Sequence, residues 1–230
     1  MRYDIIHTLI IFNLTRKVVN KLKLECLKKA LNNAQIAYDF ALKTEHPESM
    51  IRAALLIAEV YKTNGRYLGD ESFYPRAIQY TETARTQLLS LQQPALHFSV
   101  VLVRGRIEQH TGRLSAADAF FEKALGIATT AELNREQIIA LTALSQSAIL
   151  QDNLEKALSF SEKALDILDH KNEQLLAEIY NQFGQIYIKK QEYSKSLEYS
   201  QYLLSLSRKI KDVEKEITAL NNIAIVSGVK

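Results

Sequence analysis

The chain has 230 residues, of which 47% are hydrophobic and 24% are charged, so it is long and apolar enough to bury a sizeable core. Its 29 basic and 26 acidic side chains give a formal net charge of +3, too small an excess to argue for nucleic-acid binding. Cys26 is the only cysteine, which excludes an intrachain disulfide and favours a reducing, cytoplasmic compartment.

The first 48 residues are expected to form N-terminal helices that make up a degenerate first repeat. The small residues Ala30, Ala34 and Ala37 predict that residues 23–43 form the second helix of a hairpin. Residues 3–20 match a first helix poorly, and a single long helix from Thr15 to Lys43 is the alternative.

Two expectations concern single features of this N-terminal region. The apolar run from Ile5 to Phe12 is far shorter than the roughly 20 residues needed to cross a bilayer. We expect it to be the buried face of a helix, and the alternative, a processed segment, is left open. Cys26 has Leu24, Leu27 and Ala30 as neighbours, which predicts a small buried side chain.

Further along the chain, four stretches can be aligned so that small residues fall into common columns. The steps in the first column are 117 − 77 = 40, 157 − 117 = 40 and 196 − 157 = 39. A period of this size is typical of stacked helical hairpins, none of which can bury its apolar face alone. The three columns are Ala77, Ala117, Ala157 and Ser196; Thr81, Phe121, Ser161 and Ser200; and Ala84, Ala124, Ala164 and Leu203.

In each of the four stretches, the residues of the columns are preceded by a short turn, and the turn is preceded by a helix with its own small residue. In the clearest unit, Tyr180, Gly184 and Tyr187 lie on one helix face. Because Gly184 has no side chain, the second helix can approach closely there. Turns are predicted at 64–65, 111–113, 151–153 and 190–192, with an insertion of seven residues at 66–72.

These residues carry a resemblance to the tetratricopeptide repeat family, from about Ser49 to the end of the chain. They are Tyr180–Gly184–Tyr187 and the turn-plus-alanine segments 152–157 and 112–117. The resemblance implies an all-α fold, a right-handed superhelical solenoid of antiparallel helix hairpins. The period of about 40, where the family's usual unit has 34, is similar to the extended repeats of kinesin light chains, of bacterial Rap-type and PlcR-type peptide sensors, and of repeat regions attached to bacterial signalling enzymes.

The array is expected to span residues 49–230 in about four units, the last of which is a lone first helix over 217–230. Ile223, Ala224, Ile225 and Val226 leave this helix apolar where a solenoid normally has a polar cap. The pattern indicates either a truncated polypeptide or self-association through the C-terminal helix.

The sequence predicts no catalytic residues, no metal site and no cofactor. The five histidines are scattered with no i, i+4 pair, and there is neither a phosphate-binding glycine loop nor a nucleophile-elbow pattern. The basic residues between Arg16 and Lys29 lack interleaved aromatics and are interpreted as a solvated helix face. We therefore expect a protein that is not an enzyme and that contacts neither nucleic acid nor membrane.

The concave face of the array is the candidate binding surface, because first helices line the inner groove of such solenoids. Side-chain amides carry both a donor and an acceptor and can pair with the main chain of an extended peptide. The resemblance implies this role for Asn181 and Asn221, with Leu55, Leu102, Ile149 and Ile188 as apolar pockets. The predicted groove residues are Arg106, His110, Gln146, Asn181, Gln185, Asn221 and Asn222.

The predicted function is that of a non-catalytic module that binds a protein or peptide segment in this groove. The alternative is the sensory half of a longer signalling protein, truncated at the C-terminus, whose output would be a kinase, a nucleotide cyclase or a DNA-binding regulator.

Overall fold

The computed structural model describes residues 25–88, 91–169 and 172–228. Within these ranges every regular element is a helix and no strand occurs, which confirms the predicted all-α fold of helix hairpins. The described residues fall into two compact units that divide between Leu96 and His97.

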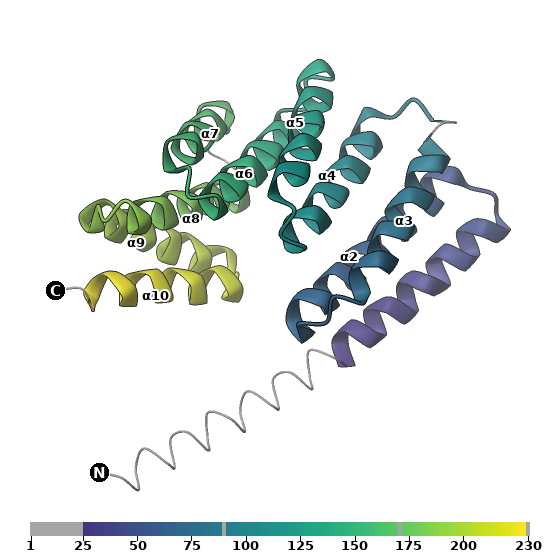
Figure 1. Cartoon of the computed structure of the whole chain (residues 1–230), viewed down its shortest axis with the longest axis horizontal. Coiled ribbons are helices and arrows are strands. Elements are labelled where there is room, and N and C mark those ends of the chain that lie inside the picture. The colour runs from purple at the N-terminus through teal and green to yellow at the C-terminus, as the bar shows by residue number, and fades with distance from the viewer. Residues whose placement is uncertain (1–24, 89–90, 170–171, 229–230) are drawn as a thin grey trace, which may run out of the picture. The chain divides into compact units, whose positions relative to one another are not determined.

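In the first unit, residues 25–43 are helical and are followed by α2 (Pro47–Leu68) and α3 (Phe73–Leu88), drawn from purple to blue in Figure 1. The second unit contains nearly all of α4 (Pro94–His110). It continues with α5 (Leu114–Thr130), α6 (Asn134–Leu150), α7 (Leu154–Ile167), α8 (Glu173–Lys189), α9 (Tyr193–Ile210) and α10 (Val213–Ser227).

The turns of the second unit repeat one backbone pattern. After Leu150, the N–H of Asp152 donates to the Ile149 carbonyl and the N–H of Asn153 to the Ala148 carbonyl, at 3.2 and 2.9 Å. This pair of hydrogen bonds is typical of a helix end that is followed by a residue in the left-handed conformation, here Asp152. The turns predicted within this unit are confirmed. Among the described residues of the second unit, those with positive φ all lie in its turns; they are Gly112, Glu132, Asp152, Gln191 and Lys211.

The turn predicted at Asn64-Gly65 is wrong, because α2 continues through both residues to Leu68. Gly69, with φ of 64°, ends this helix. A Cβ on Gly65 would lie 2.9 Å from the Tyr74 ring. The glycine therefore makes room for close packing of α3 on α2, and part of the seven-residue insertion lengthens α2.

The three small-residue columns are buried in every hairpin, as predicted. At two of the contacts between a first and a second helix, hydroxyl groups form hydrogen bonds across the two helices. Ser145 Oγ lies 2.8 Å from Ser161 Oγ and donates to the Ala157 carbonyl at 3.0 Å, and Ser196 Oγ donates to the Gly184 carbonyl at 3.0 Å. The columns are thus the positions at which a second helix meets its first helix.

An aromatic column adjoins them, and the sequence analysis missed it. Tyr80, Phe120, Phe160 and Tyr199 directly precede the second small column, and all four are half-buried. Phe160 packs against the cluster formed by α4, α5 and α6 and also against the cluster around Phe183 of α8. The aromatic column therefore joins successive hairpins of the second unit.

The helix at 25–43 departs from the prediction. Ala34 and Ala41 are its buried small residues, whereas Ala37 is exposed. Cys26 is exposed too, which corrects the expectation of a buried thiol. The predictions for residues 3–20, for the apolar run 5–12 and for a helix beginning at Thr15 concern residues outside the described ranges.

The C-terminal helix also begins earlier than expected. The sequence predicts a lone first helix over 217–230, but α10 starts at Val213, where Asp212 caps it. None of the described helices combines the length and apolarity needed to span a bilayer.

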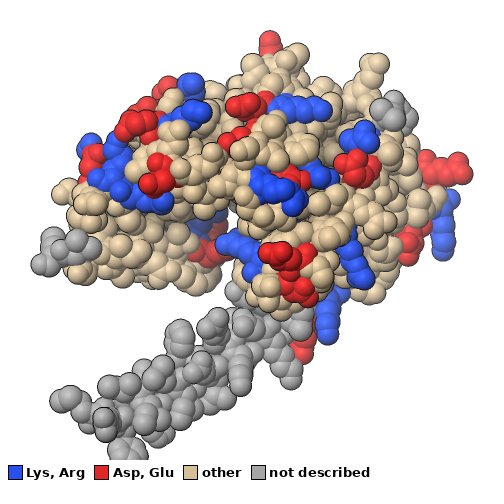
Figure 2. Space-filling view, viewed as in Figure 1, with Lys and Arg blue, Asp and Glu red and all other residues tan. Residues whose placement is uncertain are grey.

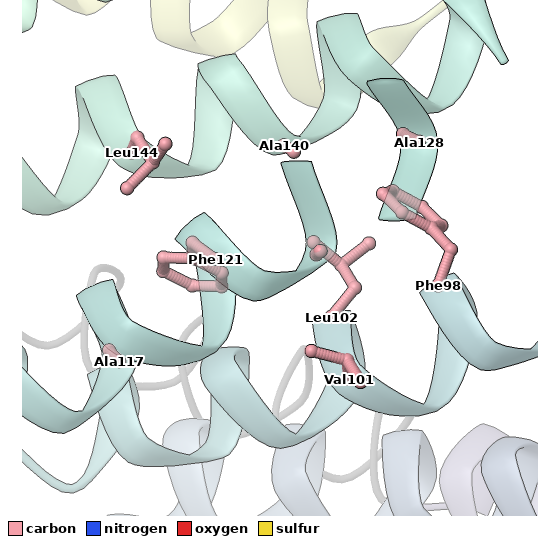
Figure 3. Packing of buried hydrophobic residues seen from close by; sticks show 9 residues of the cluster. Phe98, Val101, Leu102, Ala117, Phe121, Ala128, Ala140 and Leu144 are labelled. Carbon is pink, nitrogen blue, oxygen red and sulfur yellow. The ribbon is translucent and has the colours of Figure 1, made fainter. Parts of the chain in front are cut away.

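The approach of α4 to α5 depends on Gly105. Figure 3 shows Phe121 of α5 in the middle of a cluster with Val101 and Leu102 of α4 and Leu144 of α6. A Cβ on Gly105 would lie 2.6 and 2.7 Å from two atoms of the Phe121 ring, so the ring fills the space that the missing side chain leaves.

Gly105→Ala is therefore expected to lower the free energy of unfolding by about 1–3 kcal/mol, the usual range for overpacking a core. Urea denaturation followed by circular dichroism measures this. Gly126→Ala is the matched control on α5, because Gly126 is exposed and a Cβ there meets nothing within 4 Å. The control should be neutral or gain up to about 1 kcal/mol, and equal losses in the two variants would contradict the close approach.

Candidate functional site

Three first helices, α6, α8 and α10, are neighbours in the second unit. Lys189, at the end of α8, donates to Asp152 just after α6 at 2.8 Å. Lys215 of α10 lies 3.3 Å from the Glu178 carboxylate of α8. These contacts hold α8 between the other two helices, so equivalent positions on the three helices lie on one side of the unit.

The centre of the candidate site is a pair of amides on α8. Gln185 Nε2 donates to Asn181 Oδ1 at 3.0 Å, across one helical turn. Both side chains are half-buried, and the buried stripe of α8 with Phe183 and Ile186 lies on another side of the helix. The hydrogen bond fixes the orientation of the two amides, and together they still have N–H donors and an acceptor oxygen for a ligand.

Two predicted residues on the neighbouring helices share this register. Asn221 lies on α10 one repeat after Asn181 (221 − 181 = 40) and is exposed. Gln146 lies on α6 one repeat before Gln185 (185 − 146 = 39) and is half-buried. We call the surface formed by Gln146, Asn181, Gln185 and Asn221 the amide face.

Asn222 is placed differently from the other amides. It is buried, and its Nδ2 would lie 3.3 Å from a Cβ on Gly184. Its side chain therefore packs between α10 and α8 and is not presented to a ligand. A helix rotates by about 100° per residue, so adjacent asparagines cannot both face the same side.

Most of the predicted apolar pockets are wrong. Leu102 belongs to the core cluster around Phe121, and Ile149 packs with Ala157 and Ile186 in another. Leu55 of the first unit is buried too. Only Ile188, half-buried at the end of α8, keeps part of its surface accessible among these four residues. The inner positions were misassigned because first helices in the middle of an array are covered on several sides.

Arg106 and His110 lie on α4, which packs against α5 and thus belongs to a different repeat from the α8 amides. Both are half-buried. They remain predicted groove residues of the second unit, but the contacts described above join α6, α8 and α10 and do not include them.

A buried ion cluster near the end of α4 was missed by the sequence analysis. The Glu108 side chain is 4% exposed; its carboxylate accepts from Arg104 Nε at 2.8 Å and from Arg113. Burial alone would raise the pKa of Glu108, but the two guanidinium groups outweigh it and hold the pKa below its usual value. The i, i+4 spacing of Arg104 and Glu108 was the available signal, and the cluster anchors the turn before α5.

A second charge cluster borders the amide face. Lys215 contacts both Glu178 and Asp212, the residue that caps α10. Burial would lower the pKa of Lys215, but the two carboxylates raise it. The hydrogen bond from the Lys215 backbone N–H, at 3.0 Å, is the main reason that the pKa of Asp212 is below its usual value.

The rest of the described surface adds little chemistry. Among the described residues no group of three or more His, Cys, Asp and Glu side chains could hold a metal ion. A hollow of about 530 Å³, lined by Asp169, Asn172, Glu173, Gln174 and Ile210, includes none of the predicted groove residues. On the face drawn in Figure 2, basic and acidic side chains are interspersed and do not form a patch of one sign.

Stacked pairs of antiparallel helices with small residues at their contacts define a helical repeat protein. Two segments, residues 99–130 and 177–210, match the family model of the tetratricopeptide repeat, and each covers a first and a second helix. These two segments are tetratricopeptide repeats.

Solved structures share this fold. BtubC (BKLC) from P. vanneervenii is 17% identical, with a TM-score of 0.58 over 88% of this chain and 91% of that chain. A signal transduction ATPase with numerous domains and a tetratricopeptide repeat sensor, from Pyrococcus horikoshii, is 15% identical, with a TM-score of 0.61 over 87% of this chain. The aligned part is 33% of that protein.

PilW, a type IV pilus biogenesis factor, is 16% identical, with a TM-score of 0.46 over 91% of this chain and 94% of that chain. At these identities the likeness concerns the fold alone. No protein with curated annotation matches the sequence.

The cap of α10 makes this helix sensitive to acid. Because the pKa of Asp212 is lowered in the folded chain, its stabilising effect is complete above the ordinary aspartate pKa of about 4 and is lost as the pH falls through the lower folded value. Hydrogen-exchange protection of α10 amides should fall in that range. An Asp212→Asn variant should lose this pH dependence and keep the cap.

The N-terminus of α8 is the internal control, because its cap is Asn172, whose amide accepts from the Leu175 N–H and does not titrate. Loss of protection that is equal in α8 and α10 would show that the cap is not the cause.

Proposed function

We propose that the protein is a non-catalytic interaction module that binds an extended protein or peptide segment on the amide face. The tetratricopeptide fold supports a role in protein interaction, and tetratricopeptide repeat proteins are generally non-catalytic. The observation that carries the proposal is the hydrogen-bonded pair Asn181–Gln185 in register with Asn221 on the next first helix.

The recognition chemistry is main-chain hydrogen bonding. An extended peptide offers alternating N–H and C=O groups, and an amide side chain can bond to either. Because Gln185 already holds Asn181, the pair loses little side-chain freedom when a ligand binds. Ile188, one turn from Gln185, supplies an apolar contact beside it.

The charges around the amide face are paired. Glu178, one turn before Asn181, lies against Lys215, and Lys189 beyond Gln185 lies against Asp152. Such pairing leaves hydrogen-bonding groups rather than net charge to select the ligand. Binding is therefore expected to depend little on ionic strength, in contrast with nucleic-acid binding.

Two further elements of the proposal concern groups away from this face. Arg106 and His110 on α4 would meet a carboxylate or side chain where a longer ligand extends along the second unit. The exposed single thiol of Cys26 suits a reducing, cytoplasmic compartment.

The test uses peptides selected from a phage-displayed random library on the 230-residue protein. Their affinity, measured by fluorescence anisotropy, should fall by about tenfold or more in Asn181→Ala/Asn221→Ala, since two lost hydrogen bonds cost about 1–3 kcal/mol together. Gln201→Ala, an exposed amide on the second helix α9, is the matched control and should leave affinity unchanged. Unchanged affinity in the double variant would rule out the amide face as the binding surface.

A further inference from the structure

One side of α10 presents an apolar stripe to solvent, and in the part of the chain that the structure describes no helix covers it. Val213, Ile217 and Leu220 are 66%, 54% and 44% exposed, and Ala224 is exposed as well. Because these residues are spaced by four, three and four positions, they lie on one face of the helix. The buried residues of the opposite face, which packs on α8 and α9, are Ala219, Asn222 and Val226.

The repeat register shows which side of a first helix this stripe is. The caps of α8 and α10 are Asn172 and Asp212, one repeat apart (212 − 172 = 40). The residues of α8 that correspond to the stripe are Glu173, Ala177, Tyr180 and Gly184. This is the side of α8 on which its second helix packs.

The second helix α9 pairs with that side of α8 in antiparallel register. Ser196 Oγ donates to the Gly184 carbonyl at 3.0 Å, and Leu203 shares a buried cluster with Ala177, so numbers rise along α9 as they fall along α8. The buried stripe of α9, which has the same spacing of four, three and four, consists of Ser196, Ser200, Leu203 and Ser207. This hairpin contact is therefore made by two stripes of equal spacing that run in opposite directions.

The stripe on α10 can pair with itself in the same way, because a spacing of four, three and four reads the same in both directions. In an antiparallel pair of α10 helices, Val213 lies opposite Ala224 of the second copy, and Ile217 lies opposite Leu220 of the second copy. Every layer is then apolar, and each end combines a larger with a smaller side chain. A parallel pair would place Ala224 against Ala224 and fill that end poorly.

The composition of the stripe suits its own copy better than a second helix of the usual kind. On α8 the stripe begins with Glu173, which pairs with Lys209 of α9, whereas α10 has Val213 at this position. The small Ala177 of α8 corresponds to Ile217, and a side chain of that size would overpack a contact as close as that of α8 with α9. The stripe is thus apolar along its whole length and bulky in its middle.

The charged residues that border the stripe do not oppose such a pair. Glu216 is bound to Arg208 of its own copy at 2.8 Å. In the antiparallel register Glu216 lies opposite Ile223 of the second copy, and Glu214 lies opposite Asn221 of the second copy. No two like charges face each other, and charges at such flanking positions are what select or reject a partner helix.

We infer that two copies of the chain associate through their α10 helices, packed antiparallel about a two-fold axis between Ile217 and Leu220. Each α10 occupies on the other the place that α9 occupies on α8, so the hairpin packing of the array continues between the copies. The same surface serves both copies, and the assembly therefore closes at the dimer. The contact does not depend on the proposed peptide binding, whose centre is the amide pair on α8.

Sedimentation velocity of the 230-residue chain measures this association. One helix from each copy makes a small contact of the weak class, so the wild type should pass from monomer to dimer, and no further, as its concentration rises to about 0.1 mM. Ile217→Glu and Leu220→Lys should each weaken association by about tenfold or more, because each places two charges in the apolar layers of the dimer.

Leu150→Glu is the matched control, because Leu150 is a 52% exposed apolar residue at the end of α6, outside the stripe. Its association should equal that of the wild type. Circular dichroism confirms that each variant is folded.

A mixture of the two α10 variants tests the antiparallel register. In the mixed dimer the carboxylate introduced at position 217 lies opposite the ammonium group introduced at position 220, and the other central layer keeps Ile217 and Leu220. The equimolar mixture of Ile217→Glu and Leu220→Lys should therefore dimerise more tightly than either variant alone. A parallel pair would bring position 217 against position 217, so mixing would give no gain.

Four results would overturn the inference. A wild type that stays monomeric up to the highest concentration excludes the dimer, and association that Ile217→Glu and Leu220→Lys leave unchanged excludes α10 as its surface. Growth beyond two copies would show that two different surfaces meet. A mixture that dimerises no more tightly than the separate variants rejects the antiparallel register.

Discussion

The close approach of a first and a second helix is the constraint on which the rest of the structure depends. At Gly105 the Phe121 ring occupies the space of the missing side chain, and at Gly184 the carbonyl itself accepts from Ser196. A large ring such as Phe121 fits at such a contact only where the facing residue is glycine, and other bulky residues lie at the flanks. There they form the aromatic column that joins one hairpin to the next.

The hydroxyl groups at two of these contacts, in the hairpins α6–α7 and α8–α9, give each of these hairpins a defined register. A buried hydroxyl without a partner costs free energy, whereas Ser145 and Ser161 satisfy each other at 2.8 Å. Sliding one helix along the other would break that bond inside the core. The hydrogen-bonded serines therefore select one alignment of the two helices, whereas the alanines at other contacts only permit it.

The sequence predicted the parts of the fold that depend on local spacing. A small residue every 40 positions identified the contacts in each hairpin, and the left-handed turns followed from residues such as Gly112 and Asp152. It failed where tertiary packing outweighs local signals. Gly65 suggests a turn but instead makes room for Tyr74 inside a helix. For the site, the same spacing placed Asn181 and Asn221 in register, but it could not show that Leu102, Ile149 and Asn222 are covered by neighbouring helices.

The aromatic packing of the last complete hairpin has a spectroscopic consequence. The chain contains no tryptophan, and within residues 97–230 every tyrosine lies between Tyr180 and Tyr202. Several of these rings are packed tightly, with Phe183 and Tyr199 centroids 4.7 Å apart and Lys195 over the Tyr187 ring at 5.1 Å. Intrinsic tyrosine emission from this half of the molecule is therefore a built-in optical reporter of α8 and α9. Opening of α8 or α9 changes the emission of these tyrosines, on top of the contribution of the tyrosines in residues 1–96.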